Sequence, residues 1–299
     1  MQKQILQKAL QWTILDVLQW TADYFSSHQV DSPRLTAEIL LAETLGIDRV
    51  GLYVRFDQPL TENERHRFRE MVKRRIQREP VAYITGRKDF WKISLEVTPD
   101  VLIPRPETEI LVETALETMP DAPEKPLRIL DMGTGSGAIV ISLAHSFPGP
   151  RYFASDVSRS ALGVAFRNAA LNSVSDRIAF FASRWFDAVS PSIAFDRIVS
   201  NPPYIPSVQM PHLPPEISRY EPAQALDGDV DGLRDISILV SRAPGFLAPG
   251  GLLLLEIGHD QKPAVEGMVQ DHPDWVDLSF RRDYAGHDRV AVFTRRTGN

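Results

Sequence analysis

The tetrapeptide Asn201-Pro202-Pro203-Tyr204 has the composition of a rigid receptor for a flat nitrogen group. The Asn201 side-chain oxygen and the Pro202 carbonyl can each accept one N–H of an NH₂ group, and two acceptors fix the plane of that group. The two prolines restrict φ and hold these acceptors, and the Tyr204 ring can stack on an amide or a purine. The pattern favours chemistry on an amide or amino nitrogen over a plain proline turn.

A glycine-rich stretch lies upstream, between a short apolar run and a helical pattern that begins at Ala138. It reads Asp131-Met132-Gly133-Thr134-Gly135-Ser136-Gly137. Three glycines in five residues allow backbone angles that other residues avoid, and they let a ligand approach the main chain without a Cβ in the way. The strand-loop-helix setting indicates a cofactor loop.

Asp156 ends the next apolar run, where its carboxylate can accept hydrogen bonds from both hydroxyls of a ribose. Gly133, Gly135 and Ala138 also fit the dinucleotide fingerprint, so these features serve S-adenosylmethionine and NAD equally. The Asn201–Tyr204 motif and the lack of an evident hydride-transfer constellation favour methyl transfer. A sulfonium already activates the methyl group, so positioning and removal of water suffice without a strong general base.

Short strands that alternate with helices must position both loops. The expected strands are Arg128–Asp131, Tyr152–Asp156, Ile178–Ala182, Arg197–Ser200, Leu252–Ile257, Asp277–Arg282 and Arg289–Thr294. The first five predict a parallel sheet covered on both faces, and ligands of such sheets bind at the carboxyl ends of the strands. The last two predict an antiparallel edge hairpin. The fold class is therefore α/β, with a Rossmann-like, seven-stranded, mostly parallel sheet.

A smaller helical domain precedes this sheet, and we expect it to cover residues 1–79. Ser32-Pro33 and the capping-box spacing of Thr61-Glu62-Asn63-Glu64 mark helix starts. The arginines after Thr61 are interpreted as a solvated face in preference to a contact for an anionic partner. The spacing of the apolar residues changes at residues 80–99, where VAYIT, Gly86 and FWKISLEV predict a β-hairpin linker. Residues 100–299 then form the catalytic domain.

Composition narrows the class of protein further. The 43% hydrophobic and 24% charged fractions are those of a globular chain, and the absence of cysteine excludes disulfides and thiolate sites. Neither a secretory signal nor an apolar run long enough for a membrane span is recognisable, so we expect a cytoplasmic protein. The seven histidines lack metal-ligand spacing, and no metal is expected. Residues 81–299 hold 21 Lys and Arg against 28 Asp and Glu, which argues against a nucleic-acid groove.

Five further segments carry recognisable motifs. They are EPVAYITG at 79–86, LIPRPETE at 102–109, EPAQAL at 221–226, EIG at 256–258 and DR at 288–289. Together with the glycine loop and Asn201–Tyr204, which resemble class I amino-methyltransferases, these segments resemble the release factor glutamine methyltransferases of the PrmC/HemK family. The similarity runs from about Arg34 to Phe293 and includes the helical N-terminal region.

The resemblance implies a function and a set of site residues. The activity would be methylation of the side-chain amide nitrogen of glutamine in the Gly-Gly-Gln motif of class-1 peptide chain release factors, in support of translation termination. The helical domain would help to dock this protein substrate, and S-adenosylhomocysteine would be the product. Gly133 through Gly137 would wrap the methionine part of the cofactor, Asp156 would hold its ribose and Trp185 would border it, while Asn201 to Tyr204 would hold the glutamine. Arg105, Thr108 and Glu109 would belong to a loop near the active site, or could simply start a helix; Glu221 and Arg289 suit a scaffold as readily as a functional role.

Other functions remain open at this point. A ribosomal-protein glutamine methyltransferase would use the same tetrapeptide, although LIPRPETE resembles the release-factor branch better. A DNA or RNA base amino-methyltransferase would present a flipped exocyclic nitrogen to the same acceptors, but the acidic catalytic region and the lack of a target-recognition domain argue against it. An NAD-linked oxidoreductase or a nucleotide-binding module would explain the glycine loop and leave Asn201 to Tyr204 unexplained.

Overall fold

The computed structural model describes residues 12–120, 125–270 and 272–297, and it contains two compact units. The first unit holds the residues up to Gly86 together with Pro215–Tyr220. The second holds Arg87–Pro214 and the residues from Glu221 onward. A short downstream segment thus belongs to the N-terminal unit, which local sequence patterns did not predict.

Helices build the first unit, and the local sequence explains where several of them begin. Thr61 and Glu64 close a capping box before the third long helix, as the spacing predicted, and an equivalent box lies at the start of the first. Pro33 occupies the first turn of its helix, as expected, and Gly46 ends that helix with a φ of +64°. The helices are α2 (Ile14–Ser27), α3 (Pro33–Leu45), α4 (Arg49–Val54), α5 (Glu62–Ile76), α6 (Val81–Thr85) and α10 (Pro215–Ser218).

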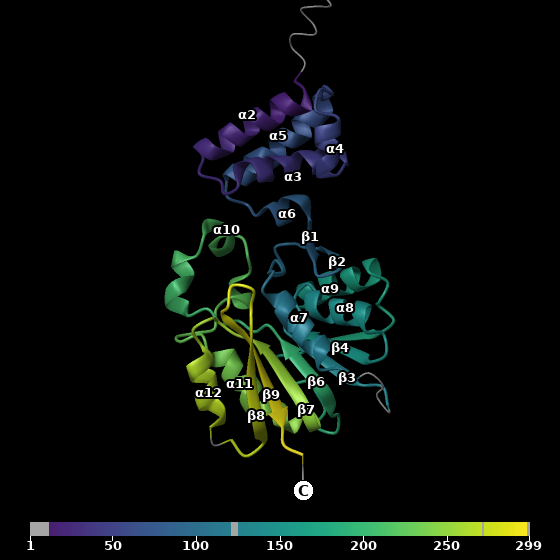
Figure 1. Cartoon of the computed structure of the whole chain (residues 1–299), viewed down its shortest axis with the longest axis vertical. Helices are drawn as coiled ribbons and strands as arrows, with labels where there is room; N and C mark the ends of the chain where they lie inside the picture. Colours follow the sequence, from purple (N-terminus) through teal and green to yellow (C-terminus); the bar gives the residue numbers. More distant parts are fainter. Residues whose placement is uncertain (1–11, 121–124, 271, 298–299) are drawn as a thin grey trace, which may run out of the picture. The chain divides into compact units, whose positions relative to one another are not determined.

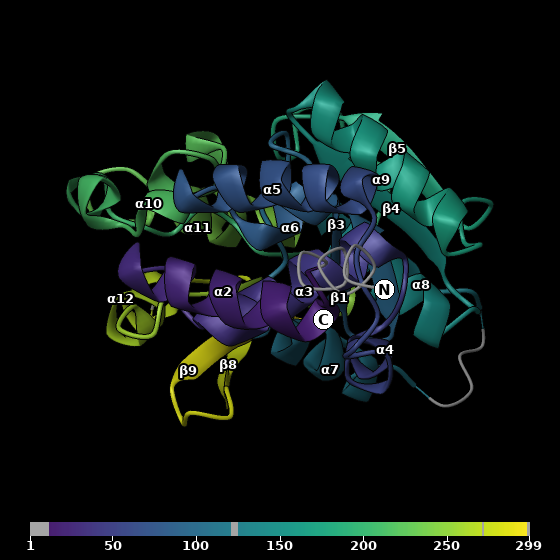
Figure 2. The ribbon, with the colours of Figure 1, turned by 90° about the horizontal axis from the view of Figure 1, so that it is seen from above.

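The core of the helical unit forms where α3 contacts both α2 and α5 (Figures 1 and 2). Apolar side chains at helical spacing bury one face of each helix. Leu18 and Phe25 from α2, Leu40 from α3 and Phe68 from α5 are among the buried residues of this cluster. The expected small helical domain is therefore present in the structure.

The predicted strand at residues 81–85 is wrong, because this segment forms the short helix α6. Pro80 precedes it, and Gly86 ends it with a φ of +72°. Tyr83 and Ile84 are buried, and Ile84 packs into the core of the helical unit, so tertiary packing outweighs the β propensity of these residues. The hairpin itself exists a few residues later, as β1 (Arg87–Phe90) paired with β2 (Ile93–Glu96).

The interpretation of the arginines after Thr61 as a solvated face is wrong for Arg75 on α5 and for Arg78, which follows that helix. Both guanidinium groups bind the carboxylate of Glu216 on α10, at distances of 2.8 and 2.9 Å. The Arg75 side chain is only 5% exposed. These ion pairs explain why the segment around Glu216 belongs to the helical unit.

A seven-stranded sheet forms the centre of the second unit, in the order β5-β4-β3-β6-β7-β9-β8. Strands β3 to β7 are parallel, and β9 pairs antiparallel with both β7 and β8. The predicted fold class and the C-terminal edge hairpin are confirmed. The strands are β3 (Arg128–Met132), β4 (Arg151–Asp156), β5 (Ile178–Ala182), β6 (Phe195–Ser200), β7 (Leu247–Glu256), β8 (Trp275–Arg282) and β9 (Asp288–Arg295).

Side chains that alternate along the strands feed two separate cores, one on each face of the sheet. On β7, Leu254 joins the core beneath α7, α8 and α9, whereas Leu253 and Leu255 join the core beneath α11 and α12 (Figure 1). The covering helices are α7 (Thr108–Glu117), α8 (Ala138–Ser146), α9 (Arg159–Leu171), α11 (Arg234–Arg242) and α12 (Lys262–Val269), and the 3₁₀ segments are η1 (Ser207–His212), η2 (Ala223–Ala225) and η3 (Ala243–Gly245). None of the described helices has the length and apolarity needed to cross a bilayer.

Candidate active site

The glycine loop lies at the carboxyl end of β3 and leads into α8. Gly133, Gly135 and Gly137 all have positive φ angles, of +69°, +54° and +83°. A Cβ on Gly137 would come within 2.7 Å of Ile141 Cδ1, so this position needs glycine for packing as well as for its backbone angle. The loop is fixed from outside by the Asn168 side chain, which donates to the Ser136 carbonyl at 2.9 Å.

Asp156 occupies the carboxyl end of β4, beside the glycine loop. Its Oδ2 accepts from the Gly135 N–H at 2.9 Å, and its Oδ1 accepts from the Ser158 N–H at 2.8 Å. Burial raises the pKa of the Asp156 carboxyl, and these backbone donors oppose that rise. Because each carboxylate oxygen has a further lone pair, Asp156 can still accept two hydroxyl groups of a ligand.

Asp131 is a fully buried carboxyl beneath the same loop. It accepts a hydrogen bond from the Thr134 hydroxyl at 2.6 Å, which ties the first turn of the loop to β3. Burial raises the pKa of Asp131 from 3.8 to about 7. Asp131 therefore positions the loop from below.

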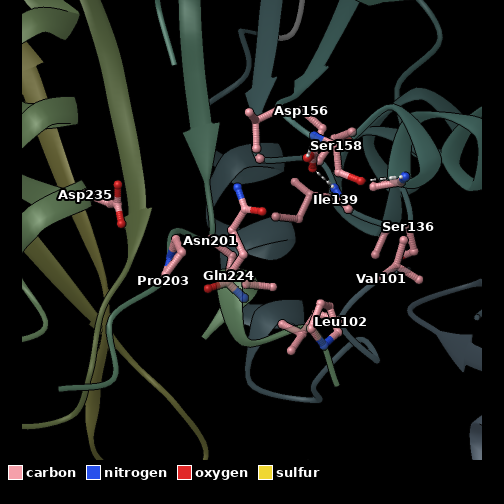
Figure 3. Close-up of a pocket in the computed structure, with 18 of the residues that line it drawn as sticks. Val101, Leu102, Ser136, Ile139, Asp156, Ser158, Asn201, Pro203, Gln224 and Asp235 are labelled. Carbon is pink, nitrogen blue, oxygen red and sulfur yellow. Dashed lines mark hydrogen bonds between the residues drawn. The ribbon is translucent and has the colours of Figure 1, made fainter. Parts of the chain in front are cut away.

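A cavity of about 360 Å³ opens above the carboxyl ends of β3, β4 and β6, within the second unit (Figure 3). It has the size and the mixed lining of a small-molecule site. Figure 3 shows Asn201 between Asp156 and Gln224 in this space. The cavity brings together most of the residues expected from the sequence, namely Gly133, Thr134, Gly135, Ser136, Asp156, Trp185, Asn201, Pro203, Arg105 and Thr108.

Trp185 closes one side of the cavity and contacts the glycine loop. A Cβ on Gly133 would lie 3.6 Å from its ring, and its indole N–H donates to Asp235 Oδ1 at 3.0 Å. Trp185 itself has a φ of +48°, an unusual angle for a bulky residue that the surrounding contacts must hold. This placement beside the loop agrees with a residue that borders a ligand.

The Asn201–Tyr204 tetrapeptide follows β6 directly. Asn201 Nδ2 donates to the Thr108 hydroxyl at 3.1 Å, which leaves Oδ1 as the free acceptor of the amide. The Tyr204 ring packs against the core beneath α11, and its hydroxyl donates to Glu256 Oε1 at 3.0 Å. This contact favours a role for Tyr204 in fixing the tetrapeptide over stacking on a substrate.

Three residues were expected in a loop near the active site, and their surroundings differ from one another. Arg105 lines the cavity and forms an ion pair with the buried carboxylate of Glu221, which also accepts the Ile103 N–H. Thr108 begins α7 and lines the cavity. Glu109 instead accepts the backbone N–H of Trp91 at 2.8 Å, and it does not line the cavity.

Other residues at the site were not identified individually from the sequence, although Leu102 and Gln224 lie in the LIPRPETE and EPAQAL segments. Val101, Leu102, Gln224 and Asp235 line the cavity, although they lie in separate loops and helices. Glu256 is 0% exposed and contacts both Thr108 and Tyr204. Its position at the end of an apolar strand was the available clue, because charged residues are seldom fully buried without a partner.

The residues present fit S-adenosylmethionine. A loop in which Gly133 and Gly135 lack a Cβ, a ribose-competent carboxylate and an aromatic wall surround one cavity, and each is suited to a part of that molecule. Among the described residues, no group of His, Cys, Asp or Glu is arranged to hold a metal ion.

The fold is Rossmann-like and the cavity suits S-adenosylmethionine, and comparison with known proteins gives the class as methyltransferase. The fold resembles a methyltransferase from Pyrococcus furiosus, with a TM-score of 0.50 and 18% identity over 80% of this chain and 100% of that one. The profile of the methyltransferase small domain matches residues 107–211, and that of the PrmC N-terminal domain matches residues 16–86.

Curated relatives identify the family. The release factor glutamine methyltransferase of Geobacter sulfurreducens is 42% identical over 279 residues, which is 93% of this chain and 95% of the relative. That of Salmonella typhimurium is 42% identical over 260 residues, or 87% of this chain and 91% of the relative. The chain therefore belongs to the release factor glutamine methyltransferase family.

Proposed function

We propose that this protein methylates the side-chain amide nitrogen of the glutamine in the Gly-Gly-Gln motif of class-1 peptide chain release factors, with S-adenosylmethionine as methyl donor. One observation carries the proposal. Asn201, an acceptor for an amide N–H, lies in the same cavity as the glycine loop and Asp156. A cofactor and a flat nitrogen group can thus be held side by side, in a family whose curated relatives are named release factor glutamine methyltransferases.

Each part of the cavity has a distinct task in binding the cofactor. S-Adenosylmethionine supplies an electrophilic methyl group on its sulfonium and leaves as S-adenosylhomocysteine. The loop Gly133 through Gly137 would hold its methionine part with the residues up to Ser136, which line the cavity, and the backbone is open to a ligand at Gly135. Asp156 would accept the ribose hydroxyls, and Trp185 would border the bound molecule.

The tetrapeptide would orient the glutamine. Asn201 Oδ1 and the Pro202 carbonyl would accept the two hydrogens of its NH₂ group, which fixes the plane of the amide and raises electron density at nitrogen. Methyl transfer would form the N–C bond as the S–C bond of the cofactor breaks, and the N–H proton that the nitrogen loses would pass to water. Because the electrophile is already activated, the protein's task is mainly orientation and the exclusion of water.

The helical unit would serve the protein substrate. Its residues match the PrmC N-terminal domain, and it is built separately from the sheet that carries the cavity. We therefore assign docking of the release factor to this unit and methyl transfer to the sheet. A role in translation termination follows from this substrate, and the cytoplasm is the compartment in which termination takes place.

Removal of the proposed acceptor tests this function. Asn201→Ala should abolish measurable methylation of a Gly-Gly-Gln peptide, while calorimetry should still detect binding of S-adenosylmethionine. Asn172→Ala is the matched control, because Asn172 lies in the same unit, outside the cavity, and its amide binds backbone carbonyls. Unchanged turnover in Asn201→Ala contradicts the role of Asn201, and binding of NAD in place of S-adenosylmethionine contradicts the whole assignment.

A further inference from the structure

Glu256 is a fully buried carboxyl group that the chemistry described above does not use. It ends β7, and it is 0% exposed. Burial raises the pKa of Glu256, while Thr108, Tyr204 and Arg289 lower it. A carboxyl group in such a place costs free energy unless it has partners, so its contacts indicate what it is there to hold.

Two hydroxyl groups from different parts of the active site meet at this carboxyl. The Tyr204 hydroxyl donates to Oε1 at 3.0 Å, and the Thr108 hydroxyl lies close enough to the same carboxyl to lower its pKa. Oε2 is buried and has no hydrogen-bond partner among the described residues, so the carboxyl keeps an unused acceptor beside the active site. Glu256 therefore contacts the last residue of the tetrapeptide directly and the first through Thr108.

The hydrogen bond between Asn201 and Thr108 has a direction. Asn201 Nδ2 donates to Thr108 Oγ1 at 3.1 Å, so the hydroxyl acts as acceptor in this contact. Its own proton is then available to another acceptor, and the unpartnered Oε2 belongs to the carboxyl whose pKa Thr108 lowers. In its ionised form Glu256 only accepts hydrogen bonds, and in that form it orients the chain from Asn201 through Thr108 to Glu256.

We propose that Glu256 is a positioning residue for methyl transfer, which orients the Asn201 amide through Thr108 so that Oδ1, and not the NH₂ group, faces the substrate nitrogen. The inference rests on the proposed function of Asn201 as acceptor for the glutamine NH₂. Glu256 lies outside the tetrapeptide, yet it would determine that the acceptor oxygen of Asn201, and not its NH₂ donor, faces the reacting nitrogen.

Glu256→Gln tests this orientation with almost no change in shape. A glutamine at this position can donate to Thr108 Oγ1, which frees the Thr108 proton to donate to Asn201 Oδ1. The Asn201 amide then turns, and its NH₂ group meets the NH₂ group of the substrate. Two donors would face each other where a donor and an acceptor are required.

The first readout is the Asn201 side chain itself, observed by ¹H–¹⁵N NMR and assigned by its absence from the spectrum of Asn201→Ala. We expect one Nδ2 proton to be protected from solvent exchange in the wild type and to exchange at least about 10-fold faster in Glu256→Gln. The second readout is kinetic. We expect kcat on the Gly-Gly-Gln peptide to fall on the order of 10- to 100-fold, with the Kd for S-adenosylmethionine within about two-fold of the wild type.

Further variants separate positioning from a merely structural effect. Glu117→Gln is the matched control, because Glu117 is an exposed carboxylate that pairs with Arg281, and both readouts should stay at the wild-type level. Thr108→Val interrupts the same chain and should reproduce both effects if Glu256→Gln does not fold. Thr108→Ser restores the hydroxyl and should recover most of the kcat that Thr108→Val loses.

Unchanged exchange of the Asn201 protons in Glu256→Gln, or in Thr108→Val, overturns the proposal. A wild-type protein that does not methylate glutamine contradicts the proposed function instead. In that case the exchange rates still decide whether Glu256 orients Asn201.

Discussion

Gly135 and Gly137 both have positive φ angles, yet an added methyl group would meet different surroundings at the two positions. At Gly137 it would lie 2.7 Å from Ile141 Cδ1 and 3.2 Å from Ala165 Cβ, whereas at Gly135 it would meet nothing within 4 Å. Gly135 also lines the cavity, and Gly137 does not. Replacement by alanine should therefore damage folding at one position and ligand binding at the other.

The expected magnitudes follow from these contacts. A left-handed backbone costs a non-glycine residue about 1–2 kcal/mol, which is the whole penalty expected for the stability of Gly135→Ala. Gly137→Ala adds overpacking of about 1–3 kcal/mol, for a total of about 2–5 kcal/mol. Gly267 is the matched control, because it is an exposed glycine of α12 with nothing within 4 Å of an added Cβ. Gly267→Ala should stabilise the protein by up to about 1 kcal/mol through helix propensity.

Urea denaturation and calorimetric titration with S-adenosylmethionine separate the two effects. Gly135→Ala should lose at least about 10-fold in affinity, because its methyl group projects into the space that the cofactor needs, and it should keep most of its stability. Gly137→Ala should lose clearly more stability than Gly135→Ala. Equal losses of stability, or wild-type affinity in Gly135→Ala, would refute this account of the loop.

Three further substitutions test separate parts of the structure. Burial raises the pKa of Asp131 to about 7, so the folded state keeps a proton that the unfolded chain releases, and stability falls as the pH rises from the unfolded pKa of 3.8 through the folded value. Asp131→Asn should remove up to about 3 kcal/mol of this dependence, measured as the difference in the free energy of urea unfolding between about pH 5 and about pH 8; an equal difference in both proteins would contradict the burial effect. Thr61→Ala breaks the capping box with Glu64 and should lower the free energy of unfolding by about 1 kcal/mol, measured as a lower Tm. An unchanged Tm would show that the cap does not contribute to stability. Trp185→Phe removes the donor to Asp235 and should cost about 1–2 kcal/mol in urea unfolding, whereas an unchanged midpoint would show that this bond contributes nothing.

Local patterns predicted much of the fold, because the residues that define each element are adjacent in sequence. The strand Ile178–Ala182 has the predicted bounds, and the capping box at Thr61 and Glu64 forms as its spacing indicated. The glycine loop and Asn201 share a cavity because parallel strands place their carboxyl ends at one edge. The topology of the sheet therefore assembles the main parts of the candidate site.

Contacts between distant residues account for what the sequence did not reveal. Glu216 binds Arg75, 141 residues away, and no local pattern marks either residue as a partner of the other. Tyr204 and Glu256 are 52 residues apart, so the buried carboxyl behind the tetrapeptide became evident only in the folded chain. The segment 81–85 has β propensity but is helical, because the core of the helical unit buries it.

Peptide mass spectrometry of a purified class-1 release factor, incubated with this protein and S-adenosylmethionine, is the decisive experiment on the proposed substrate. We expect one added methyl group, located by fragmentation on the glutamine of the Gly-Gly-Gln motif and absent when Asn201→Ala replaces the wild type. An unmodified glutamine, with binding of S-adenosylmethionine confirmed in the same preparation, would contradict the proposed substrate and direct the search to ribosomal proteins and then to nucleic acid.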